Sequence, residues 1–203
     1  MLHSIFHPSS QPSASRPTLV MLHGRGSDEH DLFGLRENLD PRLDIYSLRA
    51  PFEFEWGGYV WFGLSEDGTV DEKSLTQSKK EILSFLDSIP SKTIILMGFS
   101  MGAIMAYDIS LTEPGRYVGV LALSGFVPMQ LEKDYKLGAL EHLEIFISHG
   151  IDDPVIPVSY ARMTKDFLSR SPAQIQYREY QMGHQINDEC LADMSAWLHR
   201  VLK

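Results

Sequence analysis

Hydrophobic positions along the chain follow two alternating patterns. Short runs rich in β-branched and aliphatic residues are typical of strands buried on both faces, and longer segments between them repeat apolar residues with a helical period. The expected strands are Thr18–Leu22, Asp44–Leu48, Thr93–Met97, Val118–Leu123, Glu144–Ser148 and Ile175–Tyr180. This alternation predicts an α/β protein, a three-layer α/β/α sandwich with a mainly parallel sheet.

The helical segments carry apolar residues on one face and charged residues on the other. The expected helices are Glu72–Ser88, Ala103–Leu111, Pro157–Arg170 with the proline in its first turn, and Asp188–Leu202. Residues 1–16 are expected to form a short strand followed by a turn over Ser9–Ser15. A length of 203 residues favours one domain over residues 1–203.

Composition removes several classes of protein. The chain has 18 Lys+Arg against 27 Asp+Glu, a net charge of −9. This charge argues against electrostatic binding to nucleic acid or to an anionic membrane. Cys190 is the single cysteine, so neither an internal disulfide nor a cysteine-based zinc site is expected. Neither a membrane-spanning run nor a secretory signal is visible, so a cytoplasmic protein is expected, and small uncharged partners stay open.

The residues Gly98–Gly102 read G-F-S-M-G and lie directly between an expected strand and an expected helix. In that setting the pattern predicts a nucleophile elbow, because the two glycines permit a sharp turn that exposes Ser100 at its apex. An ordinary glycine turn with an unreactive serine is the alternative. The strand-turn-helix context favours the nucleophile.

A serine nucleophile needs a base, and the base needs an acid that orients it. His184 follows the last expected strand, and Asp152 and Asp153 follow the strand before it. The chain order Ser, Asp, His is that of α/β-hydrolases, and ligands in such sheets lie beyond the carboxyl ends of the strands. Asp153 is preferred as the acid because Pro154 stiffens its turn, with Asp152 as the turn-former.

A fourth strand end carries His23-Gly24-Arg25-Gly26. Glycines let the backbone approach a ligand, so the N–H groups of Arg25 and Met101 are predicted to form an oxyanion hole. His23 is interpreted as a structural residue that orients this loop. The Arg25 side chain points either to solvent or to an acidic group on a substrate, and the sequence leaves both open.

With these motifs in place, the chain resembles the phospholipase/carboxylesterase family of serine hydrolases, which has the α/β-hydrolase fold and includes acyl-protein thioesterases. The similarity runs from Thr18 to the C-terminus and rests on Leu22–Asp28, Gly98–Gly102, His149–Pro157 and Gly183–His184. It implies that Ser100 is the nucleophile, His184 the general base and Asp153 the acid, with Arg25 and Met101 as the oxyanion amides.

The resemblance implies a serine carboxylesterase that cleaves esters of small or medium acyl chains and needs no cofactor or metal. Thioesterase or lysophospholipase activity with the same triad is the alternative, followed by a non-catalytic binding protein on the same scaffold. Thioesterase members usually carry Gln where this chain has Met101, which weakens an assignment to protein depalmitoylation. The oligomeric state stays open, a homodimer included.

The segment Pro51–Leu64 concentrates aromatic residues at the same end of the sheet. Trp61 and Phe62 are predicted to wall an acyl or alcohol pocket, and the alternative is that they anchor a long loop to the core. The short stretch between Gly125 and Glu141 leaves no room for a large helical cap, so an open or loop-covered site is expected.

Overall fold

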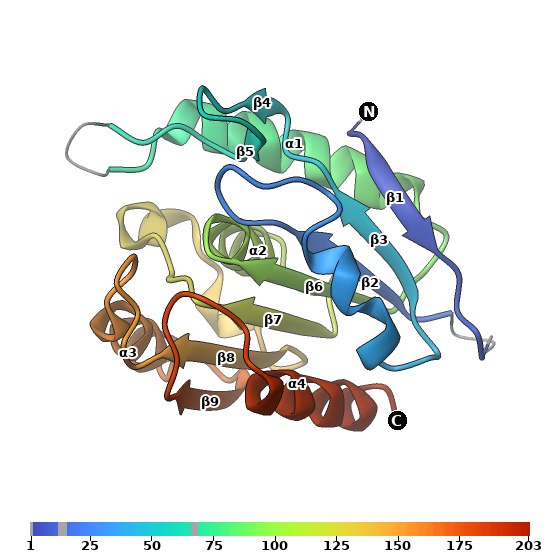
Figure 1. Ribbon diagram of the computed structural model, residues 1–203. Coiled ribbons are helices and arrows are strands. Elements are labelled where there is room, and N and C mark those ends of the chain that lie inside the picture. The colour runs from blue at the N-terminus through green and yellow to red at the C-terminus, as the bar shows by residue number, and fades with distance from the viewer. Residues whose placement is uncertain (1, 12–15, 66–68) are drawn as a thin grey trace.

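A computed structural model describes residues 2–11, 16–65 and 69–203. Seven strands of these residues form one sheet in the order β1-β3-β2-β6-β7-β8-β9 (Figure 1). β1 runs antiparallel to β3, and the other neighbours are parallel. The strands are β1 (Ser4–His7), β2 (Thr18–Leu22), β3 (Asp44–Leu48), β6 (Ile94–Phe99), β7 (Gly119–Leu123), β8 (Glu144–Gly150) and β9 (Gln174–Tyr180).

Helices cover both faces of the sheet. The α-helices are α1 (Glu72–Ser88), α2 (Met101–Thr112), α3 (Val158–Leu168) and α4 (Asp188–Val201), and the 3-10 helices are η1 (Leu32–Asn38), η2 (Met129–Asp134) and η3 (Leu137–Ala139). Helices α1, α2 and α3 pack on one face, while α4 and η1 pack on the other. The structure therefore confirms the three-layer α/β/α architecture with a mainly parallel sheet.

Alternate side chains of a strand enter two separate cores. On β2, Val20 and Leu22 pack with the helices of one face, and Leu19 and Met21 pack with those of the other. All four side chains are inaccessible to solvent. This burial on both faces explains why the strands appear in the sequence as continuous apolar runs.

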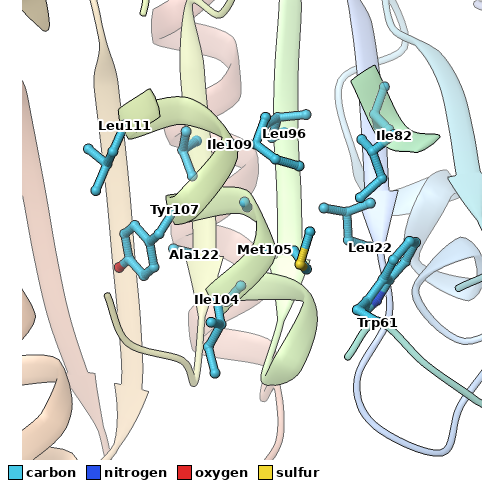
Figure 2. Packing of buried hydrophobic residues seen from close by; sticks show 14 of the residues in the cluster. Leu22, Trp61, Ile82, Leu96, Ile104, Met105, Tyr107, Ile109, Leu111 and Ala122 are labelled. Atoms are coloured by element: carbon cyan, nitrogen blue, oxygen red, sulfur yellow. The ribbon is translucent and has the colours of Figure 1, made fainter. Parts of the chain in front are cut away.

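Helix α2 lies at the centre of the larger core, and every residue in it is buried. A helix that is apolar all round is stable only when neighbours enclose it, and here β2, β6, β7 and α1 do so. Figure 2 shows the side chains that surround its axis, among them Ile104, Met105, Tyr107, Ile109 and Leu111. The helix that begins directly after Ser100 is thus fixed by packing along its whole length.

Several element boundaries differ from those expected. β6 continues to Phe99 and α2 begins at Met101, so Ser100 alone forms the turn that the sequence spread over five residues. α3 spans Val158–Leu168, two residues shorter than expected at its C-terminal end, and Pro157 caps it instead of opening its first turn. The expected turn over Ser9–Ser15 lies partly outside the described residues.

The aromatic segment after β3 contains a hairpin that the hydrophobic pattern does not reveal. β4 (Phe52–Glu53) and β5 (Tyr59–Val60) pair antiparallel as a separate small sheet. Two-residue strands are too short to show an alternation of apolar and polar positions.

The segment between β7 and β8, all of which is described, holds η2 and η3 and no larger cap. Among the described residues, no helix has both the length and the apolar character needed to span a bilayer.

The loop after β2 is tied down at two points. Gly26 N–H donates to the Tyr59 carbonyl over 2.9 Å, and Tyr59 N–H donates to the Ser27 carbonyl over 2.8 Å. Further along the loop, the buried carboxylate of Glu29 accepts from Nε and Nη2 of Arg49, at 2.6 and 2.5 Å. The paired guanidinium holds the pKa of Glu29 down at about 2, against an ordinary value near 4.5.

Two glycines let α2 approach β2 and β6 closely. A Cβ atom at Gly102 would lie 1.9 Å from the carbonyl oxygen of Leu22, and one at Gly98 would lie 2.2 Å from the carbonyl oxygen of Gly102. Both neighbours are backbone atoms, which cannot rotate away. Only glycine therefore allows the turn at Ser100 to be this tight.

We expect Gly102→Ala to lower the free energy of unfolding by at least about 1–3 kcal/mol, because its methyl group would force α2 away from β2. Gly34→Ala is the matched control, since no atom lies within 4 Å of a Cβ built at Gly34. Urea unfolding followed by tryptophan fluorescence measures both variants. Equal stability of the two would contradict the close contact.

Glu29 makes stability depend on pH in a defined direction. Because its pKa is lowered in the folded state, its stabilising contribution is present above about pH 4.5 and is lost as the pH falls toward 2. We expect the stability difference between wild type and Glu29→Gln to shrink by about 1 kcal/mol between pH 5 and pH 3.5. Urea unfolding at the two pH values tests this, and a difference that does not change with pH would exclude the ion pair as its source.

Candidate active site

Ser100 has a strained backbone conformation at the carboxyl end of β6. Its φ of 54° and ψ of −116° lie where non-glycine residues are rarely found. The conformation is held by hydrogen bonds from Ser100 N–H to the Leu123 carbonyl, 2.8 Å, and from Ala103 N–H to the Ser100 carbonyl, 3.0 Å. Strain of this kind occurs at functional sites, where it presents a side chain that a relaxed turn would not.

The structure brings His184 and Asp153 together from two loops. Nδ1 of His184 lies 2.7 Å from Oδ2 of Asp153, while Oδ1 of Asp153 accepts from the N–H groups of Val155 and Ile156 at 2.8 and 2.9 Å. Burial opposes ionisation of Asp153, but these hydrogen bonds outweigh it and keep the pKa of the carboxyl below its ordinary value. An ionised acceptor requires a proton on Nδ1, so Nε2 is left with a free lone pair.

The surroundings of the pair distinguish the two aspartates. Asp153 is buried, whereas Asp152 is exposed and contributes its N–H to the Met182 carbonyl in the turn. The imidazole of His184 packs against the ring of Phe99, with centroids 4.9 Å apart. Since Phe99 directly precedes Ser100, this contact puts the imidazole next to the strained turn.

A second histidine that the sequence analysis did not single out contacts the same carboxylate. Nε2 of His149, at the end of β8, lies 2.7 Å from the Ile156 carbonyl oxygen and 3.3 Å from Oδ2 of Asp153. Both partners are acceptors, so Nε2 carries the proton, and burial lowers the pKa of this histidine. The neutral imidazole of His149 thus donates to the Ile156 carbonyl and lies beside the Asp153 carboxylate. The one sequence signal that could have identified His149 as a site residue is its position at the carboxyl end of a predicted strand.

His23 is fixed by hydrogen bonds through both ring nitrogens. Nε2 accepts from the Ala50 N–H at 3.1 Å, which leaves Nδ1–H to donate to the Gly24 carbonyl at 2.7 Å. Burial lowers the pKa of His23, so the ring is neutral. Neither nitrogen is free to take a proton, in agreement with a role in orienting the loop.

Two backbone N–H groups lie near Ser100. Met101 is the first residue of α2, where N–H groups have no acceptor within the helix. Arg25 lies in the turn after β2, and a Cβ at the preceding Gly24 would be 3.6 Å from Cβ of Ser100. Among the described residues, no hydrogen bond uses the Arg25 N–H. This geometry suits the stabilisation of a negative charge that develops beside Ser100.

A cavity of about 520 Å³ opens over Ser100. Its lining is mostly apolar and comes from Arg25, Phe62, Leu64, Thr69, Val70, Ser100, Met101, Ile104, Phe126, Gln130, Val155, Ile156, Pro157 and Tyr160. Four of these residues, Val155, Ile156, Pro157 and Tyr160, were not expected there, although apolar residues directly after the predicted acid could have indicated a wall.

Of the two aromatic residues predicted as pocket walls, one lines the cavity and the other is buried in the core. Phe62 lines the cavity, but the prediction for Trp61 is corrected by the structure: its side chain has no exposed surface, and its Nε1–H donates to the His23 carbonyl at 2.9 Å. Trp61 also packs on the His23 ring, with centroids 5.3 Å apart. Its indole N–H needed a buried acceptor, and the backbone of the loop after β2 supplies one.

Comparisons with known proteins identify relatives over most of the chain. The family model described as phospholipase/carboxylesterase matches residues 4–202. Acyl-protein thioesterase 1 of Mycosarcoma maydis is 27% identical over 218 residues, covering 91% of each chain, and the protein of the same name from Kluyveromyces lactis is 30% identical over 158 residues, covering 71% of this chain and 69% of its own.

Solved structures share the fold. A carboxylesterase of Bacillus cereus superposes with a TM-score of 0.87 at 24% identity, covering 99% of this chain and 95% of its own. Acyl-protein thioesterase 2 of Zea mays superposes with a TM-score of 0.83 at 22% identity, covering 100% and 99%. Since the family model spans nearly the whole sequence, this chain belongs to the phospholipase/carboxylesterase family of α/β-hydrolases.

Proposed function

We propose that the protein is a serine hydrolase that cleaves carboxylic esters through Ser100, His184 and Asp153. The observation that carries the proposal is the 2.7 Å hydrogen bond between Asp153 and His184 beside the strained turn at Ser100. A binding protein has no chemical need for a buried carboxylate that orients an imidazole. Membership of a family with esterases and thioesterases supports the same reaction type.

In the first half of the proposed reaction, Oγ of Ser100 attacks the ester carbonyl carbon while Nε2 of His184 accepts the hydroxyl proton. Asp153 keeps the other ring nitrogen protonated and stabilises the imidazolium that forms. The oxyanion receives hydrogen bonds from the N–H groups of Arg25 and Met101, each worth about 2.7–4 kcal/mol in acyl transfer. The intermediate then collapses, and His184 returns its proton to the departing alcohol.

In the second half, a water molecule takes the place of the alcohol. His184 accepts a proton from the water as its oxygen attacks the acyl carbon, and the bond to Oγ of Ser100 breaks when the second intermediate collapses. The proton passes to Ser100, and the carboxylic acid leaves. The sum of the two halves is ester plus water giving acid plus alcohol, with no cofactor in either step.

The cavity supports esters of small or medium acyl chains as substrates, because it is mostly apolar and has room for a short chain beside Ser100. The relatives named acyl-protein thioesterases favour a second candidate, thioester hydrolysis by the same residues. A single domain, a cytoplasmic location and a homodimer stay predictions from the sequence.

The test is the initial rate on p-nitrophenyl esters of graded acyl length beside matched thioesters. We expect wild type to cleave short and medium esters, and Ser100→Ala to lose about 10⁴-fold or more in kcat, because the nucleophile is gone. Ser195→Ala, on the far side of the sheet in α4, is the matched control and should keep the wild-type rate.

Two results would change the proposal. Faster cleavage of thioesters than of esters at every acyl length would make thioester hydrolysis the main activity. Folded wild type that cleaves neither class, or Ser100→Ala with wild-type rates, would exclude acyl transfer through Ser100.

A further inference from the structure

Arg25 differs from every other arginine in the chain. The sequence has ten arginines, and in the described part of the structure nine of them form an ion pair with an Asp or Glu. Arg25 is the exception. Arg25 is exposed and has no carboxylate partner among the described residues, so its guanidinium is available to an anion from solution even though the chain has a net charge of −9.

The Arg25 side chain stacks on an aromatic ring and forms no hydrogen bond with the residues that the structure describes. Its guanidinium carbon lies over the ring of Phe54, 4.6 Å from the centroid, and that ring is supported by Trp56 at 5.3 Å. Stacking occupies the face of the guanidinium and leaves the N–H donors at its edge available. A cation that is oriented before its ligand arrives loses less entropy on binding.

The surroundings of the side chain favour an anion. Arg25 lines the same cavity as Ser100, and it is the only charged residue among the described residues that line this cavity. Phe62, Ile104 and Phe126 make much of the remaining wall apolar. A guanidinium keeps its positive charge throughout the physiological range, and it pairs with carboxylates and phosphates through two parallel hydrogen bonds.

The position of Arg25 also limits where the anion can be. The backbone N–H of this residue is one of the two proposed oxyanion donors, and Arg25 also belongs to the lining of the cavity. The anionic group must therefore lie within the reach of one arginine side chain from the scissile carbonyl. Only a few atoms can separate the two groups in the substrate.

We propose that the Arg25 side chain binds an anionic group of the substrate, so that the preferred substrates are esters with a carboxylate or phosphate a few atoms from the scissile carbonyl. This inference rests on the proposed hydrolysis at Ser100 and specifies the substrate class. The anion belongs either to the acyl part or to the alcohol part of the ester.

The experiment compares kcat/KM for charged and neutral esters of the same shape. Monoethyl succinate is paired with ethyl succinamate, in which an amide replaces the carboxylate on the acyl side. Butyrylglycerol 3-phosphate is paired with butyrylglycerol, which lacks the phosphate on the alcohol side. For wild type we expect at least one pair to favour the anion about tenfold, in line with the strength of a charge-assisted hydrogen bond, and the pair that does so identifies the side of the ester.

Three variants show whether Arg25 causes the preference. Arg25→Gln keeps the backbone N–H and should lower the ratio of charged to neutral kcat/KM about tenfold, whatever its absolute rates. Arg25→Lys should keep part of the ratio, because lysine retains the positive charge but lacks the planar guanidinium that forms two parallel hydrogen bonds. Arg116→Gln removes an arginine that is paired with Asp87, away from the cavity, and should leave the ratio unchanged.

Each outcome is decisive for one of the two proposals. A wild-type ratio of one or less in both pairs, or a ratio that Arg25→Gln does not change, would overturn the anion site while leaving hydrolysis intact. Absence of turnover of all four esters by wild type that cleaves p-nitrophenyl esters would also overturn the anion site, whereas failure on the p-nitrophenyl esters as well would contradict the hydrolysis itself.

Discussion

The hydrogen bond between Asp153 and His184 is the interaction on which the proposed chemistry depends. It joins two loops that follow β8 and β9, and it determines which nitrogen of the imidazole is free to accept a proton. Its acid accepts from two backbone N–H groups on the other side, and the imidazole of His149 lies beside it. Most of the surrounding structure can be understood as a means of placing this pair beside Ser100.

The parallel sheet supplies that placement. Because β2, β6, β8 and β9 are parallel, their carboxyl ends meet at one edge, where four loops contribute groups from distant parts of the sequence. Contacts of His23, Trp61 and Glu29 hold the loop after β2. These contacts fix the segment that carries Arg25, whose guanidinium lies over the ring of Phe54.

Sequence patterns predicted the layers, six of the seven main-sheet strands by their apolar runs, and the strand ends that carry Ser100, Asp153 and His184. These features follow from local periodicity and from motifs. What the sequence could not show depends on contacts between distant segments: the burial of Trp61 against His23, the position of His149 beside Asp153, and the contact of Arg25 with Phe54 in place of an ion pair among the described residues. A residue's partner, or its absence, becomes visible only once the chain is folded.

The most direct test of the account is covalent labelling by a fluorophosphonate, which reacts only with a serine activated by a neighbouring base. Mass spectrometry of the intact protein and of its peptides would give the number and position of adducts. The account predicts one adduct, on Ser100, formed much more slowly in Asp153→Asn, where His184 loses the carboxylate that orients it. An unlabelled but folded protein, or an adduct on another serine, would contradict it.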